Sequence, residues 1–217
     1  MEETMKKVCF FAVLLILVLS EHGVAQDSLG TIQLPKPDTT GGKPLMQALK
    51  ERKTSRSFSE RKLSDQVLSN LLWAAFGINR PDGHRTAPSA RNWQEIGIYV
   101  ATADGLFLYE ARPHSLRQVL TDDLRAKTGT QDFAGTAPVD LVYVANLGKV
   151  DAQSIDDRNL YVGADCGFIA QNVYLYCASE GLSTVVRGSV DREKLAKAMK
   201  LRPDQKILLA QTVGYPK

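Results

Sequence analysis

Apolar residues recur at helical spacing in the first third of the chain. Leu45, Ala48 and Leu49 predict a short amphipathic helix. A second helix is predicted to begin after Ser64, a good N-capping residue, and to end at Gly77, because glycine readily leaves the helical conformation. The apolar positions of this second helix are Val67, Leu68, Leu71, Leu72 and Ala75.

The segment from Tyr161 to Gly181 is the most apolar of the predicted helices. Its strongly polar residues are only Asp165, Gln171, Asn172 and Glu180. A helix of this character needs apolar cover on nearly every side. One domain of this size would wrap it incompletely, so a subunit interface is a reasonable partner.

Runs of β-branched and aromatic residues predict strands. Residues 95–103 and 106–111 flank an Asp-Gly turn, which is typical of a β-hairpin. Helices and strands alternate without a regular period and no repeat is visible, so the sequence predicts a mixed α+β domain. Further strands are predicted at 139–146, 183–188 and 206–216, and further helices at 116–127 and 191–200.

Composition and charge narrow the class of partner. The 217 residues are 44% hydrophobic and 24% charged, as in an ordinary globular protein of one domain or two small ones. A net charge of +3, without a Lys/Arg stripe interleaved with aromatics, does not suggest a nucleic-acid surface. An anionic small molecule is the more natural partner.

The N-terminus has the organisation of a secretory signal peptide. A basic Met5–Lys7 precedes the apolar run Val8–Leu19, and the small residues Gly23–Ala25 offer a cleavage site. The signal peptide is therefore predicted over residues 1–25. Because the apolar run is shorter than the roughly 20 residues of a spanning helix, we expect cleavage and no stable membrane anchor, with an uncleaved anchor as the alternative. Export to the periplasm is the expected localisation.

The mature chain is predicted to consist of an extended lead-in and one domain. Residues 26–42 are rich in Pro, Gly, Thr and Asp, and the domain follows over 43–217. Cys166 and Cys177 lie eleven residues apart in one predicted helix, hence about 16 Å apart, which is beyond the reach of a disulfide. We expect two buried thiols. The three histidines are scattered, so the sequence gives no support for a metal site.

Three polar segments are candidates for a ligand site. The first, the basic turn Glu51–Phe58 (ERKTSRSF), contains three cations and three hydroxyl groups in eight residues. A solvated surface turn is the alternative interpretation of such a charge run. Its cations are Arg52, Lys53 and Arg56, and its hydroxyls belong to Thr54, Ser55 and Ser57.

The second candidate is the amide loop, residues 85–94 (RTAPSARNWQ). Pro88 and Ser89 can open a turn with inward N–H groups, and the amide of Asn92 offers a donor and an acceptor, as does that of Gln94. Such a set suits the edge of a heteroaromatic ring, and an Asx-rich surface loop is the alternative. The third candidate is the strand end, Gly181–Ser189 (GLSTVVRGS), where a glycine permits close approach of backbone to a ligand.

In this order the three segments resemble the nitroreductase superfamily of FMN enzymes. The matching motifs are R-K-T-S-R-S-F, P-S-A-x-N-x-Q, G-L-x-T and G-Y-P, and the resemblance runs from about Pro44 to the C-terminus. GINRPDGHRTAPSA and DGLFLYEARPHSL are most similar to the SagB-type dehydrogenase branch. The resemblance implies a three-layer sandwich, with a mixed, mainly antiparallel sheet flanked by helices, in an intertwined homodimer with two FMN molecules at its interface.

The resemblance also implies which residues contact FMN. Arg52, Thr54 and Arg56 would meet the phosphate, the ribityl chain and the pyrimidine edge, and Lys53 would add backbone contacts. The backbone of residues 186–189 would lie beside the flavin N5 atom, and no catalytic side chain is implied. The remaining implied contacts are Pro88, Ser89, Ala90 and Asn92 from the other subunit and, in the strand end, Val186, Arg187 and Gly188, the last through its N–H.

Two departures from the family pattern bear on activity. Many relatives have a basic pair after G-Y-P that helps to hold the phosphate, whereas this sequence stops at Lys217. The Lys-Tyr pair of azoline-oxidising members has no evident counterpart, which weakens peptide-heterocycle oxidation as the activity.

The leading hypothesis is an FMN-dependent oxidoreductase. It would pass two electrons through N5 to nitroaromatics, quinones or similar flat electrophiles, with NAD(P)H as one candidate donor. The alternatives are a SagB-type flavin dehydrogenase that oxidises a small or peptide-derived substrate, and a non-catalytic flavin-binding dimer.

Overall fold

The computed structural model describes residues 29–217. The predicted signal peptide, residues 1–25, lies outside the described residues. A single domain follows, in which four α-helices and short 3-10 turns surround one sheet. The elements are β1 (Thr31–Gln33), α2 (Leu45–Glu51), α3 (Asp65–Phe76), η1 (Ala90–Asn92), β2 (Ile96–Thr102), β3 (Gly105–Glu110), β4 (Ser115–Leu120), η2 (Arg125–Lys127), η3 (Asp132–Gly135), β5 (Val139–Asn146), η4 (Leu147–Lys149), α4 (Ile155–Glu180), β6 (Ser183–Arg187), α5 (Arg192–Ala198) and β7 (Gln205–Gly214).

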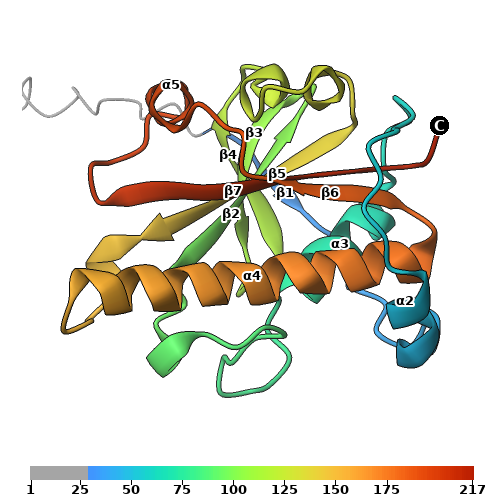
Figure 1. Ribbon diagram of the computed structural model, residues 1–217. Coiled ribbons are helices and arrows are strands. Elements are labelled where there is room, and N and C mark those ends of the chain that lie inside the picture. The colour runs from blue at the N-terminus through green and yellow to red at the C-terminus, as the bar shows by residue number, and fades with distance from the viewer. Residues whose placement is uncertain (1–28) are drawn as a thin grey trace, which may run out of the picture.

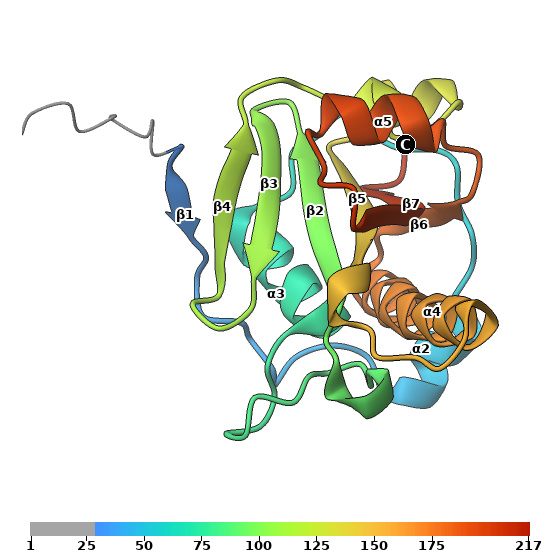
Figure 2. The same ribbon diagram turned by 90° about the vertical axis from the view of Figure 1, so that its left-hand side faces the viewer.

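The sheet has seven strands in the order β1-β4-β3-β2-β5-β7-β6 (Figure 2). The predicted α+β class is confirmed, and each pairing between described strands is antiparallel rather than mixed. Helices α2, α3 and α4 lie on one side of the sheet and α5 on the other, which gives three layers (Figure 1). Each side of the sheet has its own apolar core, one against α3 and α4 and the other against α5.

Helix α4 spans the width of the domain and borders each of the three candidate segments (Figure 1). It begins with Ser154, whose side chain accepts a hydrogen bond from the Asp157 N–H, and ends at Gly181 with φ of 69°. The predicted helix began only at residue 161, because the polar first turn lacks an apolar pattern. Its inward side packs on the sheet, whereas Leu160 and Phe168 on the outward side are 66% and 46% exposed.

Several local predictions are confirmed. Helix α3 begins after Ser64, whose hydroxyl accepts from the Val67 N–H, and Gly77 caps its C-terminus. Cys166 and Cys177 are free and buried, and burial raises the pKa of the Cys166 thiol to about 12. Within the described part of the chain, no helix combines the length and apolar character needed to cross a bilayer.

The helix predicted over 116–127 is wrong. Residues 115–120 form strand β4, which pairs with β3 on one side and with β1 on the other. Leu116 and Leu120 are four residues apart, a spacing that suits a helix, but both are buried as strand residues. Pairing with two neighbours thus overrides the local pattern. Strand β1 lies within the predicted lead-in, and its three residues are too short a run to show a strand pattern in the sequence.

Candidate functional site

The basic turn and the strand end lie side by side in the folded chain. The Ser55 N–H donates to the Thr184 carbonyl at 3.0 Å, and the Ser183 hydroxyl lies 3.1 Å from the Ser55 hydroxyl. The basic turn therefore runs along β6, the edge strand of the sheet. Two of the three predicted segments meet within one subunit.

Tyr174 of helix α4 joins these two segments. Its hydroxyl accepts a hydrogen bond from the Val186 N–H at 3.0 Å and lies 3.1 Å from the Thr54 hydroxyl. Because the tyrosine oxygen is already an acceptor, its own proton is available to Thr54. The Arg52 guanidinium lies over the Tyr174 ring, 5.3 Å from its centroid, in a cation–π arrangement. One side chain thus fixes the basic turn against the strand end.

The cations of the basic turn have no anionic partner in the described residues. None of Arg52, Lys53 and Arg56 forms an ion pair there, and Lys53 and Arg56 are exposed. A cavity of about 470 Å³ adjoins the turn. Its lining includes Lys43 with its ion-pair partner Glu51, Lys53, and the hydroxyl-bearing residues Ser55 and Tyr174. Lys53 is thus a cation of this lining without an anionic partner in the described residues, and the hydroxyl groups could donate to an anion.

Arg187 lies at the strand end, but its side chain points into the protein. It is 3% exposed, and its Nη2 atom donates to Asp140 at 2.6 Å and to the Thr128 hydroxyl at 2.9 Å. Thr212 also donates to Asp140. Burial lowers the pKa of Arg187 and raises that of Asp140 to about 6. The next residue, Gly188, is exposed and leaves its backbone at the surface for a ligand.

The amide loop lies against a different part of α4. The Ala90 N–H donates to Asp165 Oδ2 at 2.8 Å, and the Ser89 hydroxyl donates to Glu95 Oε2 at 3.2 Å. Asp165 precedes Tyr174 by nine residues, or about 14 Å along the helix. In one subunit the amide loop therefore does not complete the site formed by the other two segments.

Within the amide loop, some of the predicted ligand groups are already engaged. The Gln94 amide accepts from Arg85 at 2.8 Å and donates to Asn92 Oδ1 at 2.8 Å and to the Gly83 carbonyl at 3.0 Å. Gln94 is thus a brace of the loop rather than a free ligand group. Asn92 keeps its own amide donors, and both Asn92 and Pro88 are exposed.

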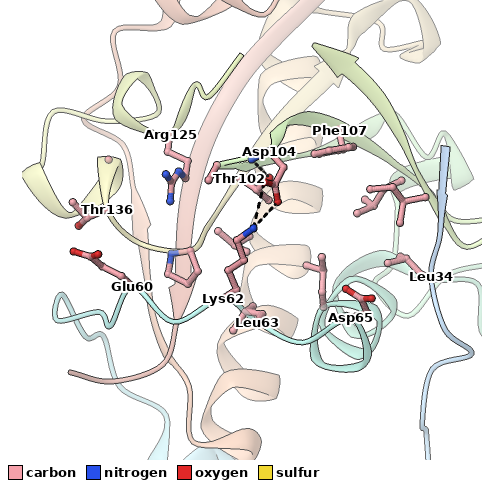
Figure 3. Close-up of a pocket in the computed structure, with 17 residues that line it drawn as sticks. Leu34, Glu60, Lys62, Leu63, Asp65, Thr102, Asp104, Phe107, Arg125 and Thr136 are labelled. Atoms are coloured by element: carbon pink, nitrogen blue, oxygen red, sulfur yellow. Dashed lines mark hydrogen bonds and ion pairs between the residues drawn. The ribbon is translucent and has the colours of Figure 1, made fainter. Parts of the chain in front are cut away.

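A second cavity, of about 500 Å³, lies away from these segments (Figure 3). Its floor is apolar, with Leu34, Leu63 and Phe107 among its residues. Lys62 reaches across to Asp104, and the two exposed side chains form an ion pair of 2.9 Å. None of the residues predicted to contact FMN lines this recess.

A Ser-His-Tyr array elsewhere has the elements of a nucleophilic site but not the proton arrangement. The Ser69 hydroxyl donates to the Pro35 carbonyl at 2.6 Å, and His114 Nε2 lies 2.7 Å from Ser69 Oγ. His114 Nδ1 lies 3.0 Å from the Tyr109 hydroxyl. When the serine hydroxyl donates to this carbonyl, its proton is not directed at the histidine, and the matching tautomer has His114 Nε2–H donating to Ser69 rather than acting as its base. This array fastens the chain before α3 to the β3–β4 hairpin.

Three residues at the site escaped the sequence interpretation. Tyr174 lies within an apolar run and gave no polar signal of its own. Glu95 was assigned to a strand by its neighbours. Asp165 did offer a signal, since a carboxylate in an otherwise apolar helix must find partners inside the fold.

Comparisons with known proteins show the family of the chain. The sequence profile of the Nitroreductase family matches residues 49–215. A protein of Methanocaldococcus jannaschii named as a candidate nitroreductase is 29% identical over 182 residues, which cover 79% of this chain and 91% of that protein. A crystal structure of a candidate nitroreductase from Ralstonia eutropha is 46% identical with a TM-score of 0.82, covering 86% of this chain and 90% of the other.

A more distant structure extends the likeness in fold alone. The NADPH:FMN oxidoreductase from Vibrio harveyi, solved with NAD+, has a TM-score of 0.60 at 18% identity and covers 80% of this chain and 69% of its own. The profile match includes the basic turn, the amide loop and the strand end. The chain belongs to the nitroreductase family, and it is an oxidoreductase of that family.

Proposed function

We propose that the protein is an FMN-dependent oxidoreductase that reduces nitroaromatics, quinones or similar flat electrophiles. The observation that carries the proposal is the junction of the basic turn with the strand end through Tyr174. This junction gathers unpaired cations, hydroxyl groups and an exposed glycine backbone at one edge of the sheet. The family to which the chain belongs supports a flavin in this position.

The residues of the junction fit the charge and shape of FMN. A phosphate ester is held well by an arginine fork and hydroxyl donors, and Arg52 and Thr54 supply both. The exposed Gly188 at the strand end permits a flat ring to approach the backbone closely. When bound, FMN supplies the two-electron chemistry. Arg56 is the cation that we assign to the pyrimidine edge, where it would stabilise negative charge.

Completion of the site requires a second copy of the chain. The amide loop lies about 14 Å along α4 from Tyr174, so Pro88, Ser89, Ala90 and Asn92 would serve the cofactor of the partner subunit. The exposed Leu160 and Phe168 on the outward side of α4 offer an apolar surface for that contact. We expect a homodimer in light scattering at micromolar concentration. A monomer that binds FMN stoichiometrically would contradict this arrangement.

The test of the function is an anaerobic titration of the purified, FMN-loaded protein. NADH and NADPH are offered separately as donors, and the loss of the oxidised flavin absorbance is followed. A nitroaromatic compound and a quinone are then added as acceptors, and reoxidation is measured. Flavin that is reduced by neither donor and reoxidised by neither acceptor would contradict the proposal.

Two alternatives have distinct outcomes in the same experiment. A SagB-type dehydrogenase would be reduced by a small or peptide-derived substrate instead of a nicotinamide donor. A non-catalytic flavin-binding dimer would be yellow but inert toward all donors. The absence of an evident Lys-Tyr pair favours the reductase over the heterocycle dehydrogenase.

The basic turn itself is tested by alanine replacements. Arg52→Ala should weaken FMN binding roughly ten- to a hundredfold, because a charge-assisted hydrogen bond contributes about 1.5 to 3 kcal/mol. Arg56→Ala should lower the reduction potential more than the affinity, because the charge it opposes develops on reduction. Lys36→Ala, at an exposed lysine outside the basic turn, is the control, because Lys53 lines the adjoining cavity. Isothermal and potentiometric titrations of the three variants measure both effects. Three results like wild type would return the segment to a solvated turn.

Export is a separate proposal. The segment 1–25 would direct an unfolded chain across the membrane, so FMN would be taken up afterwards. We expect the protein in a periplasmic fraction to begin at or near Gln26, as N-terminal sequencing would establish. An intact N-terminus on soluble cytoplasmic protein would contradict export.

A further inference from the structure

Two buried carboxyl groups meet beneath the amide loop. Glu95, just before β2, is 1% exposed, and Asp165 of α4 is 2% exposed. They accept hydrogen bonds from consecutive residues of the amide loop, Glu95 from the Ser89 hydroxyl and Asp165 from the Ala90 N–H. Two ionised carboxylates at this position would repel each other, and each would lose its hydration. One proton shared between them removes the repulsion and half of the buried charge.

The hydrogen-bond partners indicate where that proton lies. Glu95 Oε2 accepts from Ser89, and Asp165 Oδ2 accepts from the Ala90 N–H. Glu95 Oε1, in contrast, is buried and has no partner among the described residues. A proton on Glu95 would turn one of its oxygens into a donor, which an acceptor such as the neighbouring Asp165 could satisfy. A buried polar atom without a partner otherwise costs about 1 to 3 kcal/mol.

Arg85 and Lys149 line the same recess as Glu95, but within residues 29–217 no cation forms an ion pair with Glu95 or Asp165. On α4 the adjacent titratable group is Cys166, which stays neutral because burial raises its pKa to about 12. On the loop side Arg85 and Lys149 contact Gln94, through its side-chain and main-chain oxygens respectively. Burial, followed by the charge of Asp165, raises the pKa of Glu95 above its ordinary 4.5.

We propose that Glu95 and Asp165 share one proton, and that the protonated pair positions the amide loop for the cofactor. This inference rests on the proposed function, since the loop is assigned to FMN there. Through Ser89 and Ala90 the pair holds the start of the loop. The following residues need such support, because Arg91, Asn92 and Gln94 have φ of 48°, 55° and 47°, a left-handed conformation that is costly for residues other than glycine.

Loss of the proton should release the loop. Repulsion between the carboxylates would displace the groups that accept from Ser89 and Ala90, and the left-handed residues would relax. We therefore expect FMN affinity to fall as pH rises through the pKa of Glu95 in the folded protein. The pair does not touch the reacting atoms, so it is a positioning device and not a catalytic one.

Glu95→Gln is the decisive variant, because it reproduces the protonated acid without titrating. Its amide can donate to Asp165 while its carbonyl accepts from Ser89. FMN dissociation constants, measured by fluorescence between about pH 5 and pH 9, should rise several-fold for wild type and stay within about twofold for Glu95→Gln. Glu95→Ala should bind about tenfold more weakly throughout, since it loses both contacts. Glu110→Gln, at an exposed ion pair with Arg117, is the matched control and should follow wild type.

Two measurements on the protein without FMN separate this inference from the proposed function. The infrared difference between wild type and Glu95→Gln should contain a protonated-carboxyl band that disappears as pH rises through the pKa of Glu95. Wild-type stability should fall as pH rises above about 4.5, because the folded state binds the extra proton, and Glu95→Gln should lack this slope. Without band or slope the shared proton is refuted, whatever the flavin result. With both, but with FMN affinities equal in all variants, the positioning role is refuted.

Discussion

Asp140 and Glu95 are both buried carboxyl groups that lie beneath a predicted cofactor segment, yet they have opposite neighbours. Asp140 faces the Arg187 guanidinium at 2.6 Å behind the strand end, whereas Glu95 faces Asp165 behind the amide loop. Burial alone disfavours the charged form of both acids. The sign of the neighbour then decides whether the charge is kept and paired or removed by a proton.

The two sites should therefore differ in how readily they take up a proton. The pKa of Asp140, raised by burial to about 6, remains below neutral, so the pair with Arg187 is ionised. Its packing is tight, since a Cβ atom added at Gly129 would lie only 1.8 Å from Arg187 Nη1. At the Glu95 site, burial raises the pKa and so favours the protonated acid. Conversion of an acid to its amide should consequently be harmful at the first site and mild at the second.

The largest effect is expected for Asp140→Asn. The amide keeps the shape but leaves the Arg187 charge buried without compensation, which should destabilise the fold by about 3 to 5 kcal/mol. Urea denaturation measures the loss, and Asp104→Asn at an exposed ion pair is the matched control. If Asp140→Asn does not fold, the double variant Asp140→Leu/Arg187→Met should recover much of the stability, because it removes both charges. A single variant as stable as wild type would break the comparison.

A smaller effect is expected for Tyr174→Phe. The Tyr174 hydroxyl is neutral, and it holds the basic turn against the strand end by hydrogen bonds instead of an ion pair. The change leaves the Val186 N–H without its acceptor and Thr54 without its partner. The cost should be about 1 to 2 kcal/mol, with weaker FMN binding because the basic turn is loosened. Tyr161→Phe on the same helix is the control, since no hydrogen bond of its hydroxyl is present in the described residues. Equal stability of the two variants would show that the junction does not depend on Tyr174.

Elements with a clear local pattern could be predicted from the sequence, whereas an element that depends on long-range pairing could not. Helix α3 and strand β5 have clear periodic patterns and strong end signals, and both were predicted closely. Strand β4 was mistaken for a helix because its pairing with β1 and β3 is not local in sequence. The conformational preference of a short segment is weak compared with such pairing.

At the site, motifs located the segments but not their buried supports. The cations and hydroxyls of the basic turn stand out in sequence because they are polar where a ligand could reach them. Glu95, Asp165 and Tyr174 are separated from their partners by up to 120 residues, and their roles depend on contacts that only the fold creates. Arg187 illustrates the reverse case, since its place in a motif does not reveal that its side chain turns inward.

Glu95→Gln should change stability less than either preceding variant. The amide replaces the shared proton with permanent donors, so the free energy of unfolding near pH 5 should change by less than about 1 kcal/mol. The balance should shift in favour of the variant as pH rises, because only wild type loses a proton from its folded state. Urea denaturation at about pH 5 and pH 8 tests both statements. A loss of several kcal/mol at both pH values would mean that Glu95 is ionised and paired, as Asp140 is.

The smallest effect is expected for Lys62→Ala, which removes the partner of an exposed carboxylate, Asp104. Asp104 has an opposite charge at 2.9 Å, just as Asp140 does, but the Lys62 and Asp104 side chains are 73% and 68% exposed (Figure 3). Water already solvates both charges, so loss of the cation should cost at most about 0.5 kcal/mol, and less in high salt. Lys36→Ala, at an exposed lysine without an ion pair in the described residues, is the control for removal of a charge. Urea denaturation at low and high salt compares the two. If Lys62→Ala destabilised the fold nearly as much as Asp140→Asn, burial would not explain the difference expected between the two ion pairs. The pairing of opposite charges alone would then have to account for both effects.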